Sequence, residues 1–252
     1  MRRSRLLLTR PHPAAVILGG LLGVAAASVD WPRLVQRGSA AAYVTSDAGT
    51  VLYPPAPRRH RGRDVAAIQR KLRQNEAGTY ISDILLSRDS SLARWPDRTA
   101  EPLRIWVQPT ADIEDWESSF PGIVEDAFRE WAGTGIPVRF RFVTDSARAD
   151  VHVQWVDHFE EPISGKTKWA RDEHWWIVDG DITIAVHHNH GEALDESAIK
   201  AIALHEVGHL LGLDHSADSS NIMTAKVRVR DLSAADRATL QLIYTLPPGA
   251  VR

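Results

Sequence analysis

The segment HEVGHLLGLDH, from His205 to His215, constrains this chain more than any other part of it. It lies in a helical pattern that begins after Asp195. Residues four apart share one helix face, so His205 and His209 can direct their imidazoles at one ion. Gly212 lets the chain leave the helix in a left-handed conformation, and the turn brings His215 back as a third ligand. Three protein ligands leave one coordination position open, which is typical of catalytic rather than structural zinc.

Glu206 stands next to the first histidine of this segment. On a helix, its carboxylate lies beside the ion without binding it, where a base for a metal-activated water is needed. The alternative is a helix whose two histidines share a face by chance. Gly212 and His215 stand at the spacing that a third ligand requires, so we favour the metal site.

Met223 provides a second signal. The chain has two methionines, Met1 and Met223, and the second follows His215 by eight residues. A flexible thioether fills irregular space well, so it suits a position beneath a rigid cluster of histidines. The alternative is an ordinary core methionine, and the spacing favours the first interpretation.

The stretch LHEVGHLLGLDHSADSSNIM, from Leu204 to Met223, resembles the metzincin clan of zinc metalloproteases and, within it, the matrixins, which occur in bacteria as well as animals. Ser216, directly after the third histidine, is similar to the residue that marks matrixins. A C-terminal helix capped by Ser233 and Asp236 is also similar. The resemblance implies an α+β fold: a zincin catalytic domain at 101–252, with a twisted mixed five-stranded sheet and three helices.

The resemblance also implies an activity, that of a zinc-dependent endopeptidase. One catalytic Zn²⁺ would be held by His205, His209 and His215, with Glu206 as general base and Met223 in a methionine-containing turn. Two alternatives stay open. One is a non-catalytic, zinc-containing peptide-binding protein on the same fold. The other is a metal-dependent amidase that acts on a non-protein substrate.

A substrate site is expected along one strand of the sheet. The alternating stretch Asp181–Val186 predicts a strand, which we expect at the edge of the sheet, where an extended peptide can pair with it. Its proposed contact residues are Ile182, Thr183, Ile184 and Ala185. The loop from Thr224 to Asp231 is expected to shape the pocket after the scissile bond. Matrixins usually carry a tyrosine and a proline there, where this chain has Thr224 and Ala225.

Other elements follow from periodicity. Alternation predicts strands at 103–107, 138–143 and 151–155, and helical spacing predicts helices at 64–74 and from Pro121 to Trp131. Proline suits the first turn of a helix. Trp169, Trp175 and Trp176 lie in a polar stretch, and we interpret them as a cover over the edge of the core rather than as a binding platform.

The N-terminal part has the features of a targeting segment. Four arginines precede an uncharged apolar run at 14–27, whose end, at 25–28, consists of small residues. This pattern predicts a signal peptide at 1–28, with an uncleaved N-terminal anchor as the alternative. Residues 29–100 are expected to be a linker or a pro-like region. The protein is therefore expected to be exported, either secreted or periplasmic, or anchored by this segment.

Composition narrows the function classes. Cysteine is absent, which excludes disulfides, thiolate zinc ligands and latency through a cysteine. Asp83 and Asp89 are candidates for latency by position alone. The net charge of −2 does not favour nucleic acid or a membrane surface as partner. We expect a monomer that acts on protein or peptide substrates.

Further metal sites are less well supported. Animal matrixins hold a second, structural zinc ion through a histidine and an aspartate two residues apart, followed by further histidines, and we do not find that pattern here. We interpret the remaining histidines as solvated loop residues: His158, His174, His187, His188 and His190. Calcium (Ca²⁺) at Asp179 and Asp181 is a weaker interpretation still.

Overall fold

The computed structural model describes residues 42–45 and 62–251, which belong to one compact unit, Arg37–Arg252. The predicted signal peptide or anchor at 1–28 lies outside the described residues, as does most of the stretch 29–61. Within the described part, no helix combines the length and apolar character needed to cross a membrane.

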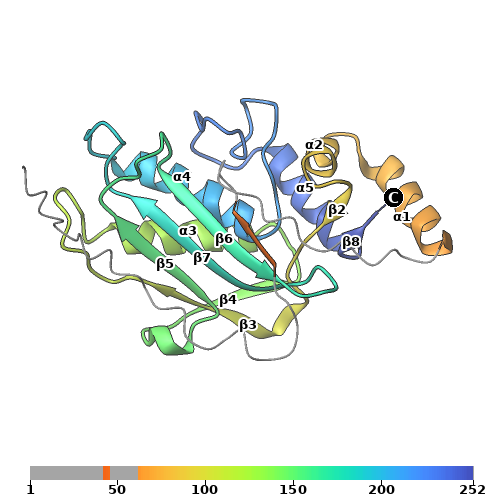
Figure 1. The fold of residues 1–252 in the computed structure, drawn as a ribbon, viewed down its shortest axis with the longest axis horizontal. Coiled ribbons are helices and arrows are strands. Elements are labelled where there is room, and N and C mark those ends of the chain that lie inside the picture. The colour runs from red at the N-terminus through yellow and green to blue at the C-terminus, as the bar shows by residue number, and fades with distance from the viewer. Residues whose placement is uncertain (1–41, 46–61, 252) are drawn as a thin grey trace, which may run out of the picture. The chain divides into compact units, whose positions relative to one another are not determined.

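A mixed sheet forms the centre of the unit (Figure 1). Its strand order is β1-β6-β7-β5-β3-β4. Four strands run parallel to one another: β7, β5, β3 and β4. Strand β6 pairs antiparallel with β7, and β1 pairs antiparallel with β6. The bounds are β1 Ala42–Thr45, β3 Arg98–Val107, β4 Val138–Phe142, β5 Val151–Val156, β6 Gly165–Arg171 and β7 Ile177–Ala185.

Helices pack against this sheet and beyond its end. Figure 1 shows α3 (Phe120–Ala132) and α4 (Glu196–Leu210) side by side behind the sheet, with α4 against β6 and β7 and α3 against β3 and β4. The other elements are α1 Gly62–Asn75, α2 Ile81–Ser87, the 3-10 turn Ser146–Arg148, α5 Ala234–Thr245, and the small sheet of β2 (Ser91–Leu92) with β8 (Gly249–Ala250). The α+β fold is confirmed: β3 to β7 form the five-stranded mixed sheet, three α-helices (α3, α4 and α5) lie within residues 101–252, and β1 adds a sixth strand.

The local signals explain the helix ends. Asp195 caps α4, because its side chain accepts a hydrogen bond from the Ala198 N–H. Ser233 and Asp236 form a reciprocal capping box at the start of α5. Helix α4 is buried almost all round, as expected of a helix that passes through the core with metal ligands on it.

The prediction that Asp181–Val186 is the edge strand is wrong. Strand β7, which contains Ile182, Thr183, Ile184 and Ala185, lies between β5 and β6. The strand missed was β6. Its core-facing positions are Gly165, Thr167 and Trp169, and a glycine and a threonine do not produce the apolar alternation that marks a half-buried strand.

The stretch before residue 101 is not separate from the rest. The Tyr80 hydroxyl donates to Asp236 Oδ1 over 3.0 Å, and Trp95 Nε1 donates to the carbonyl of Leu210, the last residue of α4, over 2.9 Å. Trp95 is fully buried. The domain boundary expected from the sequence, between residues 100 and 101, would therefore cut through the packed core. We propose that the catalytic domain includes at least residues 80–100.

Candidate metal centre

Three histidine side chains converge at the C-terminal half of α4. His205 and His209 lie one turn apart on the helix, and His215 follows on the chain after it. Their candidate ligand nitrogens all lie within 4.8 Å of one another. The ring centroids are 4.6 Å apart for His205 and His209, 4.9 Å for His209 and His215, and 5.3 Å for His205 and His215.

Backbone carbonyls determine which nitrogen of two rings carries the proton. His205 Nδ1 lies 2.8 Å from the Ile222 carbonyl and His209 Nδ1 lies 3.2 Å from the Leu213 carbonyl. A carbonyl only accepts, so each Nδ1 must donate, and each neutral ring keeps a lone pair on Nε2. The two Nε2 atoms are 3.0 Å apart. Two lone pairs directed at each other repel, and a cation bound by both removes that repulsion.

Burial keeps these rings neutral. Removal from water lowers the pKa of His205 to about 4. It also lowers the pKa of His209 well below its ordinary value, and the neighbouring histidines add to the effect. Neutral imidazole is the form that binds metal. His205 and His209 are neutral and direct their protons outward, and His215 converges on the same point, so the donor set fits a zinc ion with one position left for another ligand.

The methionine turn lies beneath this cluster. Met223 is fully buried, and its sulfur lies so close to Gly208 of α4 that a Cβ there would be 2.3 Å away. The turn is held from both sides: the Ser216 N–H donates to the Met223 carbonyl over 2.8 Å, and the Ile222 N–H donates to Asp236 Oδ2 over 2.9 Å. The Ile222 carbonyl that accepts from His205 is thereby fixed.

Glu206 is buried and faces β6. The Thr167 hydroxyl lies 2.6 Å from Glu206 Oε2 and 2.9 Å from the Glu206 carbonyl. A hydroxyl has one proton, so it donates to one of the two oxygens at a time. The other carboxylate oxygen approaches Gly165, where a Cβ would lie 2.5 Å from Glu206 Oε1. Sequence reasoning missed both residues, because a glycine and a threonine at the core-facing positions of β6 leave no apolar alternation to mark the strand.

A pocket of about 310 Å³ adjoins Glu206 and His205. Part of its apolar lining comes from α4, through Ala198, Ala201 and Ile202, and the loop after the methionine turn contributes Ala225, Lys226, Val227 and Arg230. The loop from Thr224 to Asp231 thus lines a pocket beside Glu206, and its place after the scissile bond stays a prediction. Glu206 is the single acidic residue among the described lining residues, so the pocket has an excess of basic groups.

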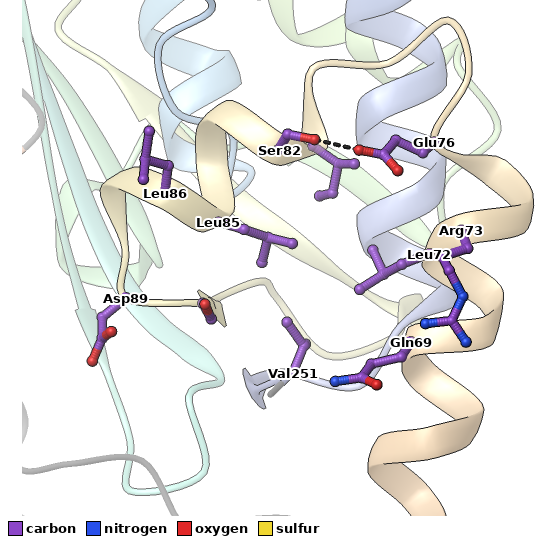
Figure 2. Close-up of a pocket in the computed structure, with 11 residues that line it drawn as sticks. Gln69, Leu72, Arg73, Glu76, Ser82, Leu85, Leu86, Asp89 and Val251 are labelled. Atoms are coloured by element: carbon purple, nitrogen blue, oxygen red, sulfur yellow. Dashed lines mark hydrogen bonds between the residues drawn. The ribbon is translucent and has the colours of Figure 1, made fainter.

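A larger hollow of about 610 Å³ lies elsewhere, between α1, α2 and β8 (Figure 2). Leu72, Leu85 and Val251 line it, and the Ser82 hydroxyl donates to Glu76 across one side. Among the described residues around it there is no histidine. It offers no metal ligands of the kind found on α4, so we assign no chemistry to it.

The other histidines are not equivalent to one another. His187 is buried, and the prediction that it is solvated is wrong: its Nδ1 lies 2.7 Å from Asp157 Oδ1 and its Nε2 lies 3.1 Å from Asp115 Oδ2. These hydrogen bonds, that to Asp115 foremost, raise its pKa. His158, His174 and His190 are exposed.

No second metal centre emerges in the described part of the chain, where His205, His209 and His215 make up the one group with metal-binding geometry. Asp179 and Asp181, which we considered for calcium, form no such group there.

Comparisons with known proteins agree with this geometry. The family model for matrixins matches residues 107–245. The chain is 25% identical to Metalloendoproteinase 1 of Glycine max over 189 residues, which cover 67% of this chain and 57% of that protein. It is 26% identical to Matrix metalloproteinase-C of Caenorhabditis elegans over 180 residues, which cover 63% of this chain and 28% of that protein. It therefore spans between about a quarter and somewhat over half of these relatives.

Proposed function

Because this chain belongs to the matrixin family, we propose that it is a zinc-dependent endopeptidase that hydrolyses peptide bonds in proteins or peptides. The observation that carries the proposal is the convergence of three imidazoles beside a buried carboxylate and an open pocket. In this proposal His205, His209 and His215 hold the zinc ion. Bound there, zinc supplies Lewis-acid chemistry, lowering the pKa of water and polarising the substrate carbonyl.

Glu206 is proposed as the general base. Its carboxylate takes a proton from the water that adds to the peptide carbonyl carbon, and it passes that proton to the amine nitrogen as the carbon–nitrogen bond breaks. The Thr167 hydroxyl, 2.6 Å from Oε2, orients the carboxylate. The close approach of Gly165 to Oε1 keeps the other oxygen in place.

The substrate is proposed to lie along β6 rather than β7. Strand β1 pairs with β6 at Lys168–Arg171, and this pairing does not include Gly165, Lys166 and Thr167, the part of β6 beside Glu206. An extended peptide can add its backbone to that part of the strand. A side chain of the peptide then enters the pocket lined by Lys226 and Arg230, whose charges favour an acidic group.

The deciding experiment is cleavage of a mixed peptide library by the purified chain, with and without a chelator, beside Glu206→Gln. Chelator-sensitive cleavage that is absent from the variant, with zinc content unchanged, is the expected result. Full activity in Glu206→Gln would refute its role as base. Bound zinc without any cleavage would favour the alternative, a non-catalytic zinc-containing peptide-binding protein.

Export is proposed from residues 1–28 alone, on the arginines and the apolar run that follows them. Sequencing the N-terminus of the protein recovered from culture medium or periplasm tests it, and a protein that still begins at Met1 would favour the anchor. We further propose a monomer, which size-exclusion chromatography with light scattering tests.

A further inference from the structure

One arginine outside the predicted catalytic domain contacts the turn that carries the third histidine. Arg88 follows helix α2. Its Nε donates to Asp214 Oδ2 over 3.0 Å, its Nη1 to the Gly212 carbonyl over 2.8 Å and its Nη2 to the Leu213 carbonyl over 2.8 Å. All three nitrogens of one planar group are therefore engaged by three consecutive residues of the turn.

The turn depends on contacts from outside itself. Helix α4 ends at Leu210, and the four carbonyls that follow the ligand His209 have no continuing helix to accept from. Each accepts from a distant side chain. Trp95 donates to the Leu210 carbonyl, Tyr244 to that of Leu211, and Arg88 to those of Gly212 and Leu213.

The contacts of Arg88 lead directly to two of the three histidines. The Leu213 carbonyl accepts from Arg88 Nη2 and also from His209 Nδ1, so the arginine fixes the oxygen that sets the orientation of this ring. Asp214 accepts from Arg88 through Oδ2 and from the backbone N–H of His215 through Oδ1, over 2.8 Å. Each histidine is therefore one hydrogen bond away from a group that Arg88 fixes.

The surroundings hold the arginine rigidly. Its side chain is 10% exposed, and its guanidinium lies over the Trp169 ring, 5.4 Å from the centroid. The Ser87 hydroxyl donates to the same Asp214 oxygen over 2.9 Å, and Asp83 accepts from the Ala217 N–H over 3.0 Å. Asp83, a latency candidate by position, is thus used to hold the same turn.

We propose that Arg88 is a positioning residue of the metal centre, which orients His209 through the Leu213 carbonyl and His215 through Asp214. The inference rests on the proposed function, since it assumes that these histidines hold zinc. Groups that hydrogen-bond to metal ligands orient them and raise metal affinity. A consequence is that removing residues 29–100 as a pro-segment would remove Arg88 and weaken zinc binding.

The test is zinc affinity, measured by chelator competition on the full chain, of Arg88→Lys beside wild type. Lysine keeps the charge but presents one ammonium instead of a planar fork, so it cannot reach all three acceptors. Zinc binding should weaken about 10- to 100-fold. With cobalt in place of zinc, the visible absorption band should also change, because it reports ligand geometry.

Arg104→Lys is the matched control. Arg104 also forks an aspartate, Asp150, through Nε and Nη2, but on β3, away from α4. It should lose a comparable ion pair and keep wild-type zinc affinity and cobalt spectrum. If both variants bind zinc like wild type, or both weaken it equally, the positioning role of Arg88 is refuted.

A second variant keeps the test decisive if Arg88→Lys does not fold. Asp214→Asn keeps the size and the Oδ1 acceptor but loses the charge that Arg88 binds, and it should also weaken zinc binding. Wild-type affinity in a folded Asp214→Asn would refute the proposal. If the wild-type chain itself bound no zinc, the proposed function would fail, and with it this inference; normal zinc binding in all variants would refute this inference alone.

Discussion

Replacing Gly208 with alanine sets two physical effects against each other. Gly208 lies inside α4 between the two helical histidines. In an exposed helix, glycine to alanine gains about 1 kcal/mol. Here the new Cβ would lie 2.3 Å from Met223 Sδ and 3.1 Å from Trp131 Cζ2. Carbon contacts are favourable near about 3.5 to 4.0 Å, so the sulfur would have to retreat by more than about 1 Å.

The steric effect should exceed the gain in helix propensity. Met223 and Trp131 are fully buried, so neither has solvent to move into. Overpacking of this kind costs about 1 to 3 kcal/mol, and occasionally more. Against the gain of about 1 kcal/mol, the expected net loss is up to about 2 kcal/mol in the free energy of unfolding. For a chain of this size, 2 kcal/mol lowers Tm by about 4 to 8 °C.

The assay is thermal and denaturant unfolding with chelator present, so that zinc contributes nothing to the difference. Gly122→Ala is the matched control, because Gly122 lies in the first turn of α3 and a Cβ there meets nothing within 4 Å. It should be neutral or gain up to about 1 kcal/mol. A Gly208→Ala variant as stable as Gly122→Ala would refute the packing argument.

Three further predictions concern the site and its surroundings. Thr167→Val removes the hydroxyl that orients Glu206, and should lower kcat/KM about 10- to 100-fold with zinc affinity unchanged; an unchanged kcat/KM would contradict the assigned contact. His187→Gln should lower stability more at pH 6 than at pH 9 in denaturant titrations. Hydrogen bonds to Asp115 and Asp157 raise the pKa of His187 in the folded state. The stability that protonated His187 contributes is therefore complete below its unfolded-state pKa of about 6.5, and it is lost as pH rises through its folded-state pKa. A loss of stability that does not depend on pH would contradict this assignment. Removing zinc from a solution at about 100 times its Kd should cost about 2.7 kcal/mol, measured as a fall in Tm; no change in Tm would mean that zinc does not bind the folded state preferentially.

Features with a short sequence span could be predicted from the sequence. The three histidines fall within eleven residues, so helix periodicity and one glycine turn bring them together without knowledge of the rest of the fold. The caps of α4 and α5 were predictable for the same reason, because a cap joins residues three apart. The α+β class followed from the family resemblance.

Features that join distant residues were decided by the tertiary structure. Thr167 meets Glu206 across 39 residues, and Arg88 meets Asp214 across 126. No local pattern identifies such pairs, since a polar residue on a strand or after a helix looks like an ordinary surface residue until its partner is known. The order of strands had the same limit. Periodicity recognised β7 as a strand but neither β6 beside it nor β1 beyond β6, so it placed the edge two strands too far in.

The sequence by itself therefore determined which ion the chain can hold and which carboxylate stands beside it, because the spacing of residues along a helix determines which side chains point to the same side. The tertiary structure decided what holds those groups in place: the carbonyls that orient His205 and His209, the strand that faces Glu206, and the arginine that fixes the third ligand's turn. Orientation is a property of packing between segments, and packing becomes defined only when the whole core has formed.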